Sequence, residues 1–255
     1  MERTEFSVES GGRSLTCALA CPGEDKRAED AALLLSFSGT RQSTMDSPAH
    51  NMGVERFVAA GHCALSFDLP NLGENVDAFG EGIRGMCAAF LGGSDPFARF
   101  IADGKAVIDA CVERGIGRAG RIFVLGVSRG GYCALRLAAA DERIGGVAGL
   151  APVTDWRVLR EFASVREREE VAGLALEHWA EELAGRPVYL AIGNHDHRVG
   201  THACVGLARR LFELEEPEEE RDSAICLHVV DSPGHAVAEE WRLEGVRFLL
   251  RLVSG

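Results

Sequence analysis

A short glycine-rich motif carries the strongest chemical signal in the sequence. Gly126-Val-Ser128-Arg-Gly130 has the spacing G-x-S-x-G and lies between an apolar run, RIFVL, and a helix-forming run, YCALRLAAA. A serine on so sharp a strand-to-helix turn takes a strained backbone conformation, which needs small residues two positions before and after it. Its hydroxyl then projects above the sheet, and the first helical turn stabilises negative charge that develops beside it. The motif predicts that Ser128 is a nucleophile; a serine that only caps the helix is the alternative interpretation.

The elements that must position this serine follow the pattern of an α/β protein. Apolar runs of strand length alternate with segments of helical period, which is typical of crossover units that build a mostly parallel sheet. A hairpin around Gly11 and Gly12 precedes them. We expect strands at residues 4–9, 14–21, 31–37, 63–67, 121–127, 147–150, 188–192 and 225–230, and helices at 52–60, 95–114 and 236–252, with one more ending at Ala140.

Two further segments stand in a telling order after the serine motif. Gly193-Asn-His-Asp196-His-Arg-Val199 follows the apolar run VYLAI, and Asp231-Ser-Pro-Gly-His235 follows the last apolar run. With these three segments the chain resembles the α/β-hydrolase superfamily, in particular the dienelactone hydrolases and the catalytic domains of prolyl oligopeptidases. The resemblance covers nearly the whole chain. It implies one α/β-hydrolase domain over residues 1–255, with a mostly parallel central sheet of about eight strands, helices on both faces and a small or absent cap at residues 155–185.

The resemblance also implies roles for the acid and the base. Asp196 matches the aspartate of the G-x-x-D-x-x-V segment, and its role would be to orient an imidazole and to stabilise the imidazolium that forms. His235 lies in the loop after the final strand, where the family places its general base. Asp155, which follows the strand after the nucleophile's helix, is the alternative acid.

An oxyanion requires two N–H donors that are already in place. The residue after the nucleophile normally gives one, so the backbone of Arg129 is the first expected donor. The family commonly has His-Gly after the first buried strand, whereas this chain has Ser38-Gly39-Thr40 there. We assign the second donor to the backbone of Thr40. Asp68, in the loop after the next strand, is expected to be structural.

Metal and nucleotide sites are not expected. His195 and His197 form an H-x-H pair, but no third ligand stands at a telling spacing. Two G-x-G-x-x-G matches, at residues 80–85 and 115–120, do not leave a strand and open a helix as a dinucleotide site requires. The glycine-rich residues 73–93 are instead expected to form a mobile loop beside the site. We predict no metal and no cofactor.

Composition and charge limit the partners. The net charge of −12 over 255 residues disfavours nucleic acid, which selects clustered Lys and Arg. No run reaches the roughly 18 apolar residues of a membrane span, and acidic residues stand at the N-terminus where a signal peptide is apolar. The sequence therefore predicts a soluble cytoplasmic protein, a monomer or a homodimer. The charged run at residues 215–222 is expected to be a solvated loop.

Eight cysteines are scattered through the chain without a CxxC pair or a structural-zinc spacing. Several of them lie inside apolar runs, where a free cysteine packs as a small hydrophobic residue. We therefore expect reduced core cysteines, and the residues that support this are Cys63, Cys111, Cys133 and Cys226. Cys17 and Cys21 share one face of a strand and form the one pair in which a metal or a bridge is considered.

The predicted activity is that of a serine esterase. Ser128 would attack a small carboxylic ester, and water would release the acyl group in a second step. One alternative is a peptidase or amidase of the prolyl oligopeptidase type, although this chain has no room for the N-terminal propeller of those enzymes. The other is a homologue that binds a ligand without turnover. An acyltransferase shares the first half-reaction. The expected partner is a small-molecule ester.

Overall fold

The computed structural model describes residues 1–215 and 223–254. In this part of the chain the strands are β1 (Glu2–Ser10), β2 (Arg13–Cys21), β3 (Leu33–Phe37), β4 (Cys63–Phe67), β5 (Ile122–Val127), β6 (Ile144–Leu150), β7 (Val188–Gly193) and β8 (Ile225–Val230). They form one sheet in the order β1-β2-β4-β3-β5-β6-β7-β8. β2 is antiparallel to β1 and to β4, and all other neighbours are parallel. The predicted α/β class and mostly parallel sheet are confirmed.

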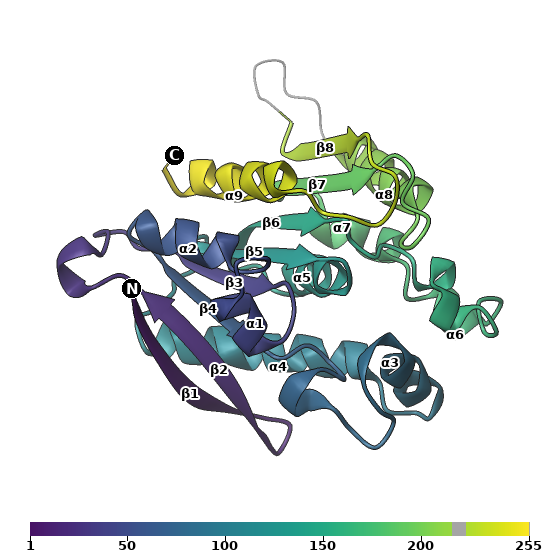
Figure 1. Cartoon of the computed structure of the whole chain (residues 1–255), viewed down its shortest axis with the longest axis horizontal. Helices are drawn as coiled ribbons and strands as arrows, with labels where there is room; N and C mark the ends of the chain where they lie inside the picture. The colour runs from purple at the N-terminus through teal and green to yellow at the C-terminus, as the bar shows by residue number, and fades with distance from the viewer. Residues whose placement is uncertain (216–222, 255) are drawn as a thin grey trace.

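The central strands are apolar because both faces of the sheet are covered. Every residue of β3, β4 and β7 is buried. One face carries the helices α4 (Pro96–Glu113), α5 (Arg129–Ala140) and α8 (Thr201–Leu214), and the other carries α2 (Met52–Ala59) and α9 (Glu239–Ser254). Figure 1 shows α2 and α9 side by side, and the two helices contact each other.

The starts of the helices follow their sequence signals. The side chain of Asp95 accepts hydrogen bonds from the N–H groups of Phe97 and Ala98, and Pro96 takes the first helical position of α4. An aspartate before a proline satisfies donors that the helix leaves free and supplies a backbone angle already suited to the helix. The predicted start of this helix is therefore confirmed.

The segment at residues 73–93 is not a loop throughout, contrary to our expectation. It contains the helix α3 (Gly82–Leu91), which buries Met86, Cys87 and Ala89. Inside this helix, residue 85 has to be glycine, because a Cβ there would overlap the carbonyl oxygen of Gly80. One of the glycines that suggested a loop is thus required by close packing of the helix. The second G-x-G-x-x-G match, at residues 115–120, lies between α4 and β5.

The segment at residues 155–185 joins β6 to β7 through short pieces of helix and not through one long helix. These pieces are three 3₁₀ turns and the four-residue helices α6 (Glu169–Ala172) and α7 (Ala180–Leu183). Figure 1 shows α6 and α3 beyond the carboxyl ends of the strands. The segment buries Trp156, Phe162 and Leu176 in the main core. It therefore packs as part of the domain at the carboxyl edge of the sheet.

One cysteine prediction is wrong. Cys63, expected to be reduced, forms a disulfide with Cys21. The register of β2 and β4 pairs Ala20 with Ala64, so the next residues of the two strands are also opposite each other, with Cα atoms 4.4 Å apart. Neighbouring antiparallel strands bring Cβ atoms within disulfide reach at such a position. Cys17, the other cysteine on this face of β2, is free and buried.

The described helices include none that is both long and apolar enough to cross a bilayer. Of the charged run at residues 215–222, only Glu215 falls within the described residues, where it follows α8. The expectation of a solvated loop at residues 216–222 lies outside them.

Candidate active site

Ser128 stands where β5 ends and α5 begins, in a backbone conformation with φ 55° and ψ −117°. Residues with a Cβ rarely adopt a positive φ, and they keep it only where the surrounding structure imposes it. Here backbone hydrogen bonds hold the serine from both sides. Its N–H donates to the carbonyl of Leu150 over 2.9 Å, and its carbonyl accepts from the N–H of Val153 over 3.0 Å. The loop after β6 therefore imposes the conformation.

The glycines of the motif are required by contact. A Cβ on Gly126 would overlap the carbonyl of Gly130, and a Cβ on Gly130 would overlap the carbonyl of Phe37. A Cβ on Gly131 would lie 2.8 Å from the Cβ of Pro152. The turn is thus pressed between the ends of β3 and β6, and the need for small residues on both sides of the serine has a direct structural cause.

The structure brings Ser128, His235 and Asp196 into one hydrogen-bonded chain. The Ser128 Oγ lies 3.0 Å from His235 Nε2, and His235 Nδ1 lies 2.8 Å from Asp196 Oδ2. The three residues follow β5, β8 and β7, whose carboxyl ends meet at one edge of the sheet. Asp155 is elsewhere: its carboxylate accepts hydrogen bonds from the backbone and side chain of Arg157.

The carboxylate of Asp196 is fully buried, and the charge is balanced by donors around it. Its Oδ1 accepts from the N–H groups of Arg198 and Val199 over 3.0 and 3.1 Å. Burial raises the pKa of this carboxyl, but the hydrogen bonds from His235 and the backbone outweigh it, so the net pKa lies below the ordinary value. Asp196 is therefore ionised at neutral pH and can hold the Nδ1–H tautomer of His235.

The loop that carries His235 is fixed by Asn194 and Ser232, which no motif had singled out. The N–H of Ser232 donates to Asn194 Oδ1 over 3.0 Å, and the Ser232 hydroxyl donates to the carbonyl of Gly234 over 3.0 Å. Asn194 in turn donates from its backbone to Val230 at the end of β8. The acid loop thus holds the histidine loop directly. The one feature of the sequence that could have indicated this role is the position of Asn194, two residues before Asp196.

The expected oxyanion donors lie on the two segments that meet at the elbow. Thr40 caps the helix α1 (Arg41–Asp46), and its hydroxyl accepts from the N–H of Ser43 over 3.0 Å. Among the described residues the backbone N–H groups of Thr40 and Arg129 have no protein acceptor. The next N–H, that of Arg41, is engaged by Asp68 over 2.6 Å. Asp68 therefore fixes this loop, in agreement with the structural role expected of it.

His50 is a neighbour of this loop that sequence reasoning did not select. Its Nδ1 lies 2.6 Å from the Ser43 hydroxyl, and a Cβ on Gly39 would come within 3.2 Å of the same nitrogen. Burial, followed by the positive charge of Arg242, lowers the pKa of His50. A neutral imidazole therefore packs against Gly39. In the related families, the histidine of the common His-Gly pair stands directly before the corresponding glycine in the sequence.

The remaining candidate ligands are not gathered into a site. The rings of His195 and His197 have centroids 6.4 Å apart. Within residues 1–215 and 223–254, no three histidine, cysteine or acidic side chains are arranged to share a metal ion.

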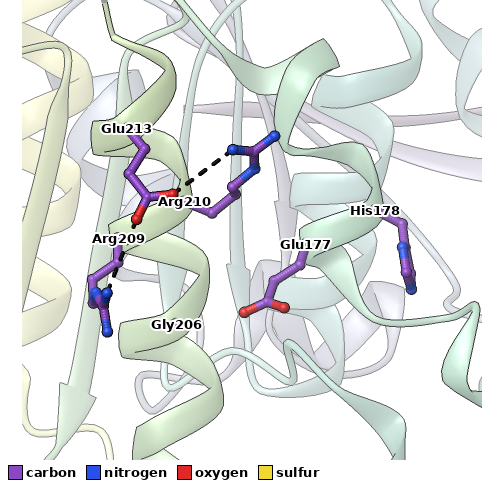
Figure 2. Close-up of a pocket in the computed structure, with 6 residues that line it drawn as sticks. All are labelled: Glu177, His178, Gly206, Arg209, Arg210 and Glu213. Carbon is purple, nitrogen blue, oxygen red and sulfur yellow. Dashed lines mark ion pairs between the residues drawn. The ribbon is translucent and has the colours of Figure 1, made fainter.

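A pocket of about 370 Å³ lies away from the serine, between α8 and the 3₁₀ turn Leu176–Trp179. Figure 2 shows Glu213 reaching toward Arg209 and Arg210 on α8, with Glu177 on the facing turn. The ion pairs are 4.0 and 3.7 Å long between exposed side chains. Exposed pairs of this kind contribute little to stability, so they are no evidence for a binding site in this surface groove.

Comparison with known proteins decides the family. Residues 98–252, more than half of the chain, match the model of the prolyl oligopeptidase family. The chain belongs to the prolyl oligopeptidase family. It is therefore a serine hydrolase of the α/β-hydrolase superfamily. No curated protein sequence matches the chain.

Solved structures share the fold of this family member. A cold-adapted esterase from an Arctic intertidal metagenomic library has a TM-score of 0.70 at 21% identity, over 99% of this chain and 93% of that one. An acetyl xylan esterase from Paenibacillus sp. R4 gives 0.73 at 16% identity, over 98% and 83%. A prolyl endopeptidase gives 0.70 at 16% identity, over 99% of this chain but 39% of its own.

Proposed function

We propose that this family member hydrolyses small carboxylic esters through an acyl-enzyme formed on Ser128. The observation that carries the proposal is the hydrogen-bonded chain from Ser128 through His235 to a buried, ionised Asp196. A serine hydroxyl is a weak nucleophile until a base takes its proton, and the imidazole lies within reach to do so. The strained elbow presents the hydroxyl to the carboxyl edge of the sheet.

In the proposed reaction, His235 Nε2 removes the proton of Ser128 as Oγ attacks the ester carbonyl. The carbonyl π electrons move to oxygen, and the N–H groups of Thr40 and Arg129 stabilise the resulting oxyanion. When the intermediate collapses, the alkoxide leaves and takes the proton from His235. Water then attacks the acyl-enzyme with His235 again as base, releasing the acid and restoring Ser128.

The choice of esters over peptides is supported by the extent of structural similarity. The Arctic esterase and the acetyl xylan esterase are matched over 93% and 83% of their chains, whereas the prolyl endopeptidase is matched over 39%. Peptide hydrolysis is the second candidate because family membership itself favours it. A p-nitrophenyl ester and the p-nitroanilide of the same acyl group separate the two: we expect the ester to be turned over and the anilide not.

The decisive experiment for the mechanism is labelling with a fluorophosphonate, with the adduct located by mass spectrometry. We expect an adduct on Ser128 that disappears in Ser128→Ala and in His235→Ala. His195→Ala is the matched control, since it removes an exposed histidine beside Asp196, and should label as the wild type does. A folded wild-type protein that takes no adduct contradicts the proposal.

Cytoplasmic location, monomeric or homodimeric state and a small-molecule partner remain predictions from the sequence. The Cys21–Cys63 disulfide bears on location, because structural disulfides persist in oxidising compartments and are rare in the cytosol. Because Cys63 is fully buried, the test is to quench cells with acid and alkylate the free thiols after denaturation. Alkylated Cys21 and Cys63 would fit the cytoplasm, and a retained disulfide would indicate an oxidising compartment.

A further inference from the structure

The side chain of Arg129 lies beside the nucleophile and lacks a counter-ion among the described residues. It is mostly enclosed, and its Nη1 donates only long hydrogen bonds, to the carbonyl of Pro70 over 3.4 Å and to Met86 Sδ over 3.7 Å. The acid whose charge acts on it, Glu81, forms no ion pair with it within 4.0 Å in the described part of the chain. Burial lowers the pKa of this guanidinium.

Three other enclosed arginines are compensated, whereas Arg242 has a 3.5 Å hydrogen bond from its Nε to the carbonyl of Val237 and, among the described residues, no ion pair. Unlike Arg242, Arg129 directly follows the nucleophile in the chain. Arg198 forms a two-pronged pair with Glu161 over 2.8 and 2.9 Å. Arg136 stacks on the ring of Trp179, and Arg186 donates to the carbonyls of Asp141 and Ile144. A buried positive charge is costly unless it is paired or well hydrogen-bonded. Arg129 therefore has unused capacity for an anion.

The free part of the guanidinium is open to a ligand. Within the described residues, Nε and Nη2 of Arg129 donate to no protein acceptor, yet neither is among the buried polar atoms that lack a partner. Both groups are therefore accessible from solvent. Their N–H bonds form the fork that binds a carboxylate through two parallel hydrogen bonds. This fork is carried by the residue that directly follows Ser128 in the chain.

We propose that Arg129 binds a carboxylate carried by the substrate, so that the preferred esters are anionic. The inference rests on the proposed ester hydrolysis at Ser128 and adds the chemical class of its substrate. The backbone N–H of Arg129 serves the oxyanion, while its side chain selects the charge of the bound molecule. An acidic protein with an unpaired cation beside its nucleophile would select anions locally even though its overall field repels them.

The test compares two pairs of esters that differ only in charge. The first pair is the mono-p-nitrophenyl ester of glutaric acid and its methyl-capped form. The second pair is 4-carboxyphenyl butyrate and its methyl-capped form, which place the charge on the alcohol side. For at least one pair we expect kcat/KM to be about ten- to a hundredfold higher for the anion, the range that a charge-assisted hydrogen bond supplies.

Variants assign that preference to Arg129. The ratio of the two kcat/KM values should fall to about one in Arg129→Gln and take an intermediate value in Arg129→Lys; using a ratio cancels any change in the backbone donor. Arg84→Gln is the matched control, because Arg84 is an exposed arginine on α3, the helix that also carries Met86. Its ratio should stay at the wild-type value. No preference for either anion, or a preference that Arg129→Gln leaves intact, overturns the proposal.

Two further measurements separate this proposal from the proposed function. Fluorophosphonate labelling of the same wild-type preparation reports the reactivity of Ser128 without regard to substrate charge. Titration calorimetry on Ser128→Ala with monomethyl glutarate, which carries one carboxylate, and with uncharged dimethyl glutarate reports the anion site without catalysis. We expect monomethyl glutarate to bind more tightly, and Ser128→Ala/Arg129→Gln to lose the difference. Equal binding of the two ligands refutes the anion site even if the serine is reactive.

Discussion

Replacing Ser128 with glycine tests whether the elbow stores backbone strain. A non-glycine residue at φ 55° and ψ −117° costs about 1–3 kcal/mol, which glycine does not incur. Glycine also gains freedom in the unfolded chain, which lowers stability by about 0.4–1 kcal/mol relative to alanine. The difference predicts that Ser128→Gly unfolds with a free energy about 1–2 kcal/mol higher than that of Ser128→Ala. Both variants lack the hydroxyl, so the comparison isolates the backbone.

Urea unfolding followed by far-ultraviolet circular dichroism measures this difference. Ala88 gives the control, because it is exposed inside α3 and has an ordinary helical conformation. Ala88→Gly should therefore be less stable than the wild type by about 0.5–1 kcal/mol. The opposite signs at the two positions are the signature of strain. If Ser128→Gly is no more stable than Ser128→Ala, the reasoning about the elbow is refuted.

Three other predictions concern the acid and the disulfide. Asp196→Asn should lower kcat for a p-nitrophenyl ester by about a thousand- to ten-thousandfold, because the amide favours the wrong tautomer of His235; a loss below tenfold contradicts this. The pKa of Asp196 is lower in the folded protein than in the unfolded chain, so ionisation of this carboxyl stabilises the fold at neutral pH. That contribution is lost as the pH falls from about 5 toward about 3. The urea midpoint of Asp196→Asn should therefore depend less on pH over this window than the wild-type midpoint does. Reducing Cys21–Cys63 with dithiothreitol should lower the unfolding free energy by about 2–4 kcal/mol, with no further effect of reductant on Cys63→Ala. An unchanged wild-type urea midpoint would show that the bond does not form in solution.

The strands and the site segments were predictable because their signals are local. β3 and β7 lie under helices on both faces, so a mostly apolar run was enough to find them. The segments after β5, β7 and β8 then had to meet, because parallel strands place their carboxyl ends along one edge. Motif order therefore located Ser128, Asp196 and His235 without any knowledge of the loops between them.

Features that depend on register or on contacts between distant segments were not predictable. The Cys21–Cys63 bond follows from the pairing of β2 with β4, which no short-range pattern specifies. α3 was missed because Gly85 weighs against a helix in sequence, although its close contact with Gly80 is what the packing requires. The position of His50 against Gly39 is of the same kind, since the two residues are joined by α1 and a turn.

Backbone strain in this protein is concentrated at the edge where the proposed reaction takes place. Among the described residues, positive φ angles outside glycine occur at Asn71, Ser128 and Ala151. They follow the ends of β4, β5 and β6, and Asn71 is next to Pro70, whose carbonyl accepts a long hydrogen bond from Arg129 Nη1. Ala151 is fixed by a hydrogen bond of its N–H to Ala191, and its neighbour Leu150 in turn fixes Ser128. Three loops at the carboxyl edge of the sheet thus hold strained conformations, and hydrogen bonds to neighbouring strands fix two of them, those of Ser128 and Ala151.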